Sequence, residues 1–368
     1  MAAAGDVRIP LFQLESWQAP SYPEVRARLS EVVERGRFVL GPEVEAFERE
    51  FAGYLGVPHV IGVANGTDAI TIALRALGIA SGDEVVVPSF TFYASVEAVI
   101  AAGARPVFCD VDLQTRNVTV GSVRAALTPR TKAIVAVDLF GSPAPDLREL
   151  GLPVLEDAAQ AAGASLNGRR AGALGDVATF SFYPSKNLPC FGDGGAIVTA
   201  DDGVAERART LRFHGSRDKE TFVEVGYNSR LDELQAAVLR VLLPHLEDWS
   251  EGRRRVAGSY EAAGLGRHVG LPTAQAGAAP AWHLYVVTHG RADALIAELR
   301  ATGIEARGYY RTPSHRQPAL EPYVPRAHSL PATEELARTN LAVPMGPMLR
   351  RSEVEEVVAG VQRVLAGV

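Results

Sequence analysis

The most constraining feature of this 368-residue chain is an alternation of short apolar runs with amphipathic segments over residues 59–199. Strands are predicted at residues 59–64, 84–87, 105–109, 133–139, 153–156, 177–183 and 196–199. Helices are predicted from residue 66 onward and at residues 95–102 and 120–127. Several runs are apolar throughout, which is typical of strands covered by helices on both faces. We therefore expect an α/β fold with a mostly parallel central sheet sandwiched by helices.

The segments on either side of this alternation predict a second, smaller domain. A helix at residues 42–56 precedes the strands, and a long helix at residues 231–249, interrupted by Pro244, follows them. The later pattern comprises a strand at 283–287, a helix at 291–301, a strand near 305–310 and a final helix from Ser352 with a capping box to Glu355. We predict an N-terminal arm plus large domain at residues 1–245 and a small C-terminal α/β domain at residues 246–368.

Composition excludes several classes of partner. Charged residues make up 22% of the chain and the formal charge is −6, with both signs mixed, so no nucleic-acid footprint is expected. No apolar run is long enough to span a bilayer. Cys109 and Cys190 lack a spacing partner, which favours a reducing cytoplasm. The eight histidines show no helical ligand pair, so we expect no metal site.

Lys186 is the first candidate for chemistry. It lies in FSFYPSKNLPCFGDGGAIVT, between an aromatic run and a glycine turn, and the chain has only two other lysines, Lys132 and Lys219. A partly desolvated lysine can lose its proton near neutral pH, which arginine cannot, and its amine can then form a Schiff base with an aldehyde. The alternative is an ordinary solvated lysine in a loop.

Three residues are candidates for binding a phosphate. Gly66 and Thr67 lie where a predicted strand turns into a helix, so free backbone N–H groups and the helix dipole would favour an anion there. The alternative is a plain helix cap made by the Thr67 side chain. Ser181 lies on a predicted strand five residues before Lys186, where its hydroxyl could meet the same phosphate or simply be satisfied within the strand.

Three further residues could contact a flat heterocycle. Asp157 directly follows a predicted strand and could hold a pyridinium N–H, although it could instead cap the segment after it. Gln160 would lie on the same side of a helical turn. Phe92 follows another predicted strand and could stack on a ring, or belong to the core. A phosphate cradle, a stacking ring, a carboxylate for a ring nitrogen and a lysine for an aldehyde together describe pyridoxal phosphate (PLP).

With these residues in hand, the chain resembles the aspartate-aminotransferase-like (type I) PLP enzymes, and within them the sugar aminotransferases of the DegT/DnrJ/EryC1/StrS family. The resemblance extends from residue 9 to the last helix. The motifs that carry it are VANGTDA, EDAAQAAGA, GDVATFSFYPSKNL with GDGGAIVT, and GYNSRLDELQAA. The resemblance implies the type I PLP-dependent transferase fold.

The resemblance also implies roles for residues that match family motifs. Lys186 would be the Schiff-base lysine and general acid/base, with Asp157 on the pyridine nitrogen. The remaining cofactor contacts would be Gln160 beside the ring and its 3-hydroxyl, Phe92 stacked on the ring, and Gly66, Thr67 and Ser181 around the phosphate. Asn228 would reach the cofactor phosphate of the neighbouring subunit, which implies a homodimer with shared active sites. Arg230, Tyr309 and His315 match positions that line the sugar-nucleotide cleft.

The implied reaction transfers an amino group from an amino acid, usually glutamate, to a nucleotide-linked keto sugar, with release of a 2-oxo acid and with pyridoxamine phosphate (PMP) as the amino-carrying cofactor form. The segment GIEARGYYRTPSHRQPAL is closer to the 3-keto branch than to the 4-keto branch. A cyclitol ketone is an alternative acceptor. More distant alternatives are a PMP-dependent sugar dehydratase, in which histidine replaces the lysine, and a non-catalytic sugar-nucleotide sensor.

Two single positions and one short run depart from common family usage. Asp138 in VDLFG and Gly346 in VPMGP stand where many members have histidine, and residues 189–191 replace a run of smaller residues. These departures leave the expected cofactor chemistry untouched. They concern the sugar and the position of its ketone.

Overall fold

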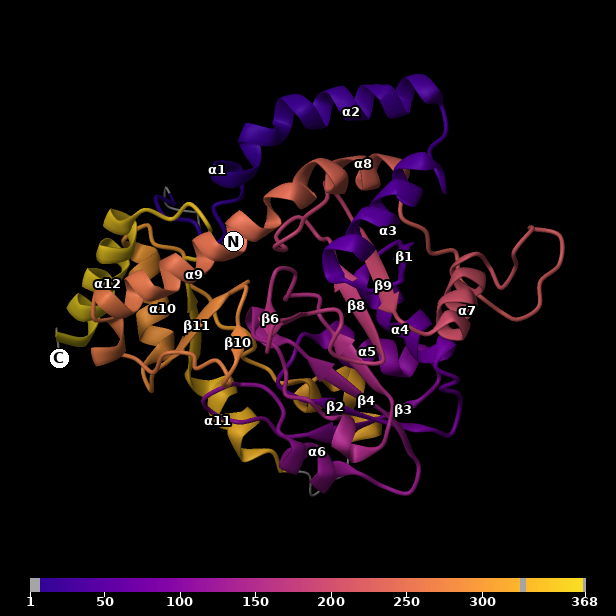
Figure 1. The fold of residues 1–368 in the computed structure, drawn as a ribbon. Coiled ribbons are helices and arrows are strands. Elements are labelled where there is room, and N and C mark those ends of the chain that lie inside the picture. Colours follow the sequence, from indigo (N-terminus) through magenta and orange to yellow (C-terminus); the bar gives the residue numbers. More distant parts are fainter. Residues whose placement is uncertain (1–6, 325–328, 367–368) are drawn as a thin grey trace.

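A seven-stranded sheet forms the centre of the molecule in the computed structural model, which describes residues 7–324 and 329–366 (Figure 1). In chain order its strands are β1 (His59–Val63), β2 (Glu84–Pro88), β3 (Arg105–Cys109), β4 (Thr131–Val137), β5 (Val154–Asp157), β8 (Val177–Ser181) and β9 (Gly195–Thr199). The helices of this region are α1 (Leu14–Gln18), α2 (Tyr22–Arg35), α3 (Pro42–Leu55), α4 (Gly66–Ala76), α5 (Tyr93–Ala101), α6 (Val120–Ala126), α7 (Asp202–Arg212) and α8 (Glu233–Leu242).

The sheet is mostly parallel, as the alternation of strands and helices predicts. Its spatial order is β1-β9-β8-β5-β4-β2-β3. The β2, β3, β4, β5 and β8 strands pair in parallel, whereas β9 runs antiparallel to both of its neighbours, β1 and β8. The parallel strands therefore end at one edge of the sheet, which is where ligands bind in folds of this kind.

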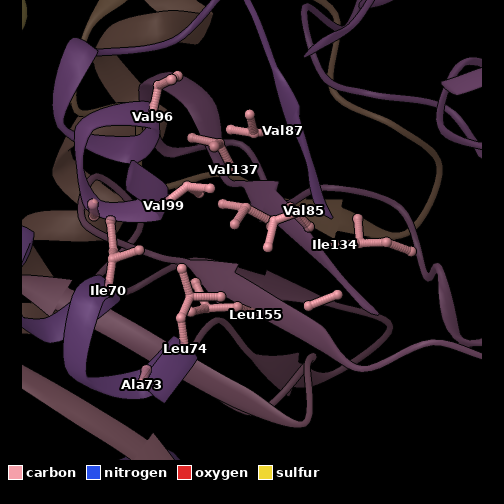
Figure 2. Packing of buried hydrophobic residues seen from close by; sticks show 14 of the residues in the cluster. Ile70, Ala73, Leu74, Val85, Val87, Val96, Val99, Ile134, Val137 and Leu155 are labelled. Carbon is pink, nitrogen blue, oxygen red and sulfur yellow. The ribbon is translucent and has the colours of Figure 1, made fainter. Parts of the chain in front are cut away.

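Helices cover both faces of the sheet because successive strand side chains point to opposite sides. Val60, Phe180 and Val198 pack in one core cluster with side chains of α3 and α8. The adjacent Ile61 and Ile197 belong to a second cluster with α4, α5 and α7. Figure 2 shows side chains of α4 and α5 meeting those of β2, β4 and β5 in this second cluster. Near-continuous apolar strands thus reflect burial on both faces.

A third core cluster lies in the C-terminal part of the chain. The strands β11 (Tyr285–Thr288) and β12 (Asn340–Val343) pair antiparallel there. The helices α9 (Leu246–Ala262), α10 (Ala292–Ala301) and α12 (Arg351–Ala366) contribute to this cluster, whereas Leu336 of α11 (Pro331–Thr339) packs in the cluster that contains α4 and α5. Ile9 of the N-terminal arm also belongs to this cluster. Among the described residues, no helix has the combined length and apolar character needed to cross a membrane.

The predicted domain boundary after residue 245 stays a prediction. It coincides with an interruption between two helices. The expected long helix at residues 231–249 is instead two helices, α8 and α9, joined by the 3-10 turn η4 (Leu243–His245). Pro244 lies inside this turn. Proline lacks the N–H that a continuous helix requires, so the turn forms where the sequence places it.

Two local predictions in the C-terminal part are wrong. Residues 305–310 do not form a strand: only isolated bridges join Ile304 to Ile9 and Arg307 to Ala342. The two bridges use different neighbours, so no continuous ladder can form along this segment. The expected capping box at Ser352 is also displaced, because α12 begins at Arg351 and Glu353 accepts the backbone N–H of Arg350 at 2.8 Å.

Three short strands form a separate small sheet beside the large one. They are β6 (Ser165–Leu166), β7 (Arg169–Arg170) and β10 (Ala278–Ala279). The β6 strand pairs antiparallel with both of the others. This pairing ties residues 278–279, which precede β11, to the loop that follows β5.

Candidate active site

Two strand ends and one helix start meet at the carboxyl edge of the sheet. Asp157 is the last residue of β5, Ser181 is the last residue of β8, and Gly66 is the first residue of α4. The two strands are paired neighbours, and a Cβ added to Gly66 would lie 2.8 Å from the Ser181 Cβ. Real Cβ atoms do not approach this closely, so the contact between α4 and β8 requires glycine. The structure therefore brings three predicted cofactor residues to one place.

The start of α4 leaves two backbone donors free. Asn65 is the N-cap, and its side-chain oxygen accepts the Asp68 N–H at 2.8 Å, so Thr67 does not act as the cap. In the described part of the chain, the N–H groups of Gly66 and Thr67 have no hydrogen-bond acceptor. Free N–H groups at the positive end of a helix dipole, with the Ser181 hydroxyl beside them, form a site suited to a phosphate.

Asp157 lies in a buried position held by two donors. Ser95 of α5 donates its hydroxyl to Oδ2 at 2.7 Å, and the Ala159 N–H donates to Oδ1 at 3.2 Å. Burial raises the pKa of Asp157, and the Ser95 hydroxyl, the Ala159 N–H and the positive charge of Lys186 all oppose this rise. No helix follows Asp157, so it does not cap one. Its carboxylate is thus available to a cationic N–H donor in a region of low dielectric constant.

Gln160 is held by hydrogen bonds at both ends of its amide. Its Oε1 accepts the Phe140 N–H at 2.7 Å, and its Nε2 donates to the Tyr310 hydroxyl at 3.1 Å. The Tyr310 ring lies 5.8 Å from Phe92 and 6.3 Å from Phe140, measured between centroids. Phe92 is 54% exposed, which excludes a role in the core. Tyr310 was not singled out by sequence reasoning, which selected its neighbour Tyr309 from the same aromatic pair.

Lys186 lies on a loop that is closed at its base. The Phe182 N–H donates to the Gly194 carbonyl at 2.8 Å, and the Cys190 N–H donates to the Phe182 carbonyl at 2.7 Å. The backbone N–H of Lys186 donates to the Tyr183 carbonyl at 2.8 Å. Burial lowers the pKa of Lys186 to about 8, and the negative charge of Asp157 acts in the opposite direction. About a tenth of this amine is therefore neutral at pH 7, far more than for an ordinary lysine, which favours the nucleophilic role over that of a solvated surface lysine.

A buried histidine lies next to this lysine. The Nδ1 of His283 is 3.3 Å from the Oδ1 of Asn187, which in turn donates its Nδ2 to the Ala281 carbonyl at 2.8 Å. Burial lowers the pKa of His283 well below its usual value, and the positive charges of Lys186 and Arg253 lower it further. His283 is therefore a neutral neighbour of Lys186. No spacing pattern in the sequence distinguishes it from the other histidines.

Two of the remaining predicted residues lie beyond α7. Asn228 is exposed, and its backbone forms an isolated bridge with Phe213. The Arg230 guanidinium lies 6.0 Å from the centroid of the Phe213 ring. No contact in the described residues joins either side chain to Lys186 or Asp157. Their predicted roles stay predictions.

Tyr309 and His315 lie in the segment that leads from α10 to α11. The Tyr309 N–H donates to the Oδ1 of Asn340 at 2.6 Å. His315 is buried, with Nδ1 2.6 Å from the Ser89 hydroxyl and Nε2 2.9 Å from the Glu334 carboxylate. Both ring nitrogens of His315 therefore have protein partners in this structure. The sugar-cleft roles of the two residues also stay predictions.

The residues present fit PLP. The free N–H groups of Gly66 and Thr67 suit its phosphate, the Asp157 carboxylate suits its ring nitrogen, and the partly neutral Lys186 suits its aldehyde. The exposed face of Phe92 offers a surface for stacking. Within the described residues, no group of three or more His, Cys, Asp or Glu side chains could hold a metal ion.

Comparisons with known proteins identify the family and the fold. The model of the DegT/DnrJ/EryC1/StrS aminotransferase family matches residues 22–362. A dTDP-3-amino-3,4,6-trideoxy-alpha-D-glucose transaminase of Streptomyces venezuelae is 46% identical over 363 residues, which cover 96% of each chain. A UDP-N-acetyl-3-dehydro-alpha-D-glucosamine 3-aminotransferase of Acidithiobacillus ferrooxidans is 43% identical over 98% of each chain. The crystal structure of S. venezuelae DesV in complex with a ketimine intermediate superimposes with a TM-score of 0.93 at 45% identity, over 97% of this chain and 98% of that chain.

Proposed function

Because this chain belongs to the DegT/DnrJ/EryC1/StrS aminotransferase family and is a PLP-dependent sugar aminotransferase, we propose that it aminates a nucleotide-linked 3-keto sugar with glutamate as the amino donor. The observation that carries the amination chemistry is the position of Lys186 near the Asp157 carboxylate, where burial lowers the pKa of the amine, at the same sheet edge as a free phosphate cradle. Nothing in a non-catalytic sugar-nucleotide sensor would require a lysine with a lowered pKa there.

Seven residues of this chain would hold the cofactor. Gly66, Thr67 and Ser181 would bind the phosphate, and Asn228 would bind that of the partner subunit. Asp157 would keep the ring nitrogen protonated, with its carboxylate oriented by Ser95. Phe92 would stack on the ring, and Gln160, fixed by its two hydrogen bonds, would lie beside the 3-hydroxyl.

Lys186 would perform the proton transfers. When bound, PLP supplies an aldehyde that carries the amino group and a ring that accepts the electron pair left on carbon. The Lys186 Nζ takes the α-proton of the amino-acid donor in the first half-reaction and returns a proton to the sugar carbon in the second. A pKa of about 8 keeps both protonation states of this amine accessible near neutral pH, which suits an alternating acid and base.

Two observations favour a 3-keto acceptor. Both reported relatives carry the 3-position in the name of their product or activity. The segment from Gly303 to Leu320, which carries Tyr310 into the site, is also the segment whose sequence is closer to the 3-keto branch. The two relatives use different nucleotides by name, dTDP and UDP, so the nucleotide is left to experiment.

A screen of acceptors tests this proposal. The purified holoprotein is incubated with glutamate and one acceptor at a time. The acceptors are 3-keto sugars linked to dTDP or UDP, their 4-keto isomers, and a keto-inositol. Products are identified by mass spectrometry and NMR. We expect an amino sugar from a 3-keto compound together with 2-oxoglutarate. Amination of a 4-keto sugar or keto-inositol alone would contradict the 3-keto assignment, and loss of a sugar hydroxyl would indicate the dehydratase reaction instead.

We also propose a homodimer in which each subunit contributes Asn228 to the other's site. The loop after α7 projects from the body of the chain (Figure 1), and its side chains Phe222, Val223 and Val225 are 59%, 71% and 84% exposed. Exposed apolar residues of this size favour a protein partner. A second copy of the chain is the partner that would also place the exposed Asn228 at a cofactor phosphate.

Subunit mixing tests the shared site. Lys186→Ala and Asn228→Ala proteins, each inactive or weak alone, are mixed and verified heterodimers are assayed. One site of each heterodimer would then have both residues intact, so about half of the wild-type activity per dimer is expected. Heterodimers without any regained activity would show that Asn228 acts within its own subunit.

The proposed compartment is the cytoplasm. Both cysteines, Cys109 and Cys190, are buried free thiols. Burial raises the pKa of the Cys190 thiol to about 12, so this side chain is unreactive toward oxidants. Free thiols of this kind are typical of proteins in reducing compartments.

A further inference from the structure

Two carboxyl groups outside the cofactor site face one another at the ends of β4 and β5. The register pairs Ala136 with Glu156 and Val137 with Asp157. Successive side chains of a strand point to opposite faces, so Asp138, directly after β4, lies on the same face as Glu156. Asp157 points to the other face, where Ser95 holds it. All three carboxyl groups are buried.

Glu156 has the surroundings of an ionised carboxylate. Its Oε1 accepts the Gly172 N–H at 2.6 Å, and its Oε2 accepts the N–H groups of Leu174 and Gly175 at 2.8 and 3.1 Å. Burial raises the pKa of Glu156, but these three backbone donors oppose the rise and favour its charged form. These bonds also fix the turn that leads into β8. Glu156 therefore acts as a buried anion with a structural role.

Asp138 has the surroundings of a protonated acid. Its Oδ1 accepts the Ala144 N–H at 2.7 Å, whereas its Oδ2 is buried and has no donor among the described residues. The group adjacent to Asp138 is the Glu156 carboxylate. Two acceptor oxygens are stable neighbours in a buried place only when a proton lies between them. Burial first, and then the charges of Glu156 and Asp157, raise the pKa of Asp138 well above its usual value.

We propose that Asp138 is a positioning residue: it keeps its proton in the folded protein, donates it in a hydrogen bond to Glu156, and thereby leaves Asp157 ionised for the cofactor. Without this proton the ends of β4 and β5 would carry three adjacent negative charges with Lys186 as the nearby opposite charge. Because charge repulsion is mutual, an ionised Asp138 would favour protonation of Asp157. Only this last step rests on the proposed PLP function.

Three matched amide substitutions test the assignment. Asp138→Asn can donate to Glu156 and still accept from Ala144, so we expect wild-type stability and a PLP dissociation constant within twofold of wild type. Glu156→Gln turns an N–H toward backbone N–H donors, so it should lower the thermal midpoint markedly. Asp157→Asn should leave the fold intact and weaken PLP binding at least tenfold. An Asp138→Asn protein that loses PLP affinity as Asp157→Asn does would overturn the proposal.

The pH dependence of unfolding tests the proton without cofactor. In the apoprotein, a raised pKa in the folded state means that folding takes up a proton, so stability falls as pH rises from the unfolded-state pKa toward the folded one. The test divides the equilibrium constant for unfolding of the wild-type apoprotein by that of Asp138→Asn. Above pH ~4, this ratio should rise about tenfold per pH unit. A ratio that stays constant between pH 5 and 7 would refute the proton on Asp138, even if Glu156→Gln fails to fold. Absence of PLP binding in wild type would refute the proposed function alone.

Discussion

The most informative perturbation of this site is a pH titration of the lysines. Burial lowers the pKa of Lys186 to about 8 against the opposing attraction of Asp157. An ordinary lysine titrates near pH ~10.4, so at pH 7 the neutral amine should be about 250 times more abundant at Lys186. Because only the neutral amine attacks a carbonyl, this ratio is the reactivity advantage that the fold gives to this position.

Competitive acetylation measures this advantage directly. The apoprotein is labelled with trace acetic anhydride between pH 6 and 11, and each lysine peptide is quantified by mass spectrometry. Lys132 and Lys219 are exposed and provide the internal reference. Lys186 should reach half of its maximal reactivity near pH 8, and Asp157→Asn, which removes the opposing charge, should move this midpoint to lower pH. A Lys186 that titrates in parallel with Lys132 and Lys219 would refute the reasoning.

The remaining predictions concern cofactor contacts. Ser95→Ala removes a 2.7 Å hydrogen bond to a buried carboxylate, worth about 1.5 kcal/mol or more, so PLP affinity measured by fluorescence should fall about tenfold. An unchanged affinity would mean that Asp157 needs no support from Ser95. Phe92→Ala should leave apoprotein stability within about 0.5 kcal/mol because Phe92 is exposed, yet weaken PLP binding about 2- to 12-fold through lost stacking. Equal losses of apoprotein stability and of PLP binding free energy would argue for a core role of Phe92. Gly66→Ala places a Cβ against Ser181 and should lower the free energy of unfolding, measured with denaturant, by about 1–3 kcal/mol. It should also reduce the affinity for PLP more than the affinity for pyridoxal, which lacks the phosphate. Equal reductions for the two ligands would contradict the phosphate cradle.

The parts of the fold set by local sequence were predictable. Apolar runs and helix ends are local signals, so the predicted strand at residues 105–109 matches β3, and the predicted end of α3 falls at Gly56, whose φ is 73°. Asp157 could be placed at the sheet edge because parallel strands end on one side. The error at residues 305–310 has the converse cause. That segment bridges two different neighbours, and no local pattern encodes such a path.

The contacts between elements were not predictable from the sequence. Ser95 supports Asp157 only because the start of α5 reaches the end of β5, and Tyr310 reaches Gln160 across 150 positions of the chain. The Asp138 and Glu156 pair depends on the adjacency of β4 and β5. Sequence reasoning can nominate residues by chemical type, but the partners that adjust their pKa values follow from strand order.

Reductive trapping tests the central claim most directly. The holoprotein is treated with borohydride, which makes the lysine–cofactor bond permanent, and the digest is mapped by mass spectrometry. We predict a single phosphopyridoxyl adduct on the peptide that contains Lys186, with no adduct in Lys186→Ala. An adduct on Lys132 or Lys219 instead, or a protein that stays unmodified at saturating PLP, would contradict the account.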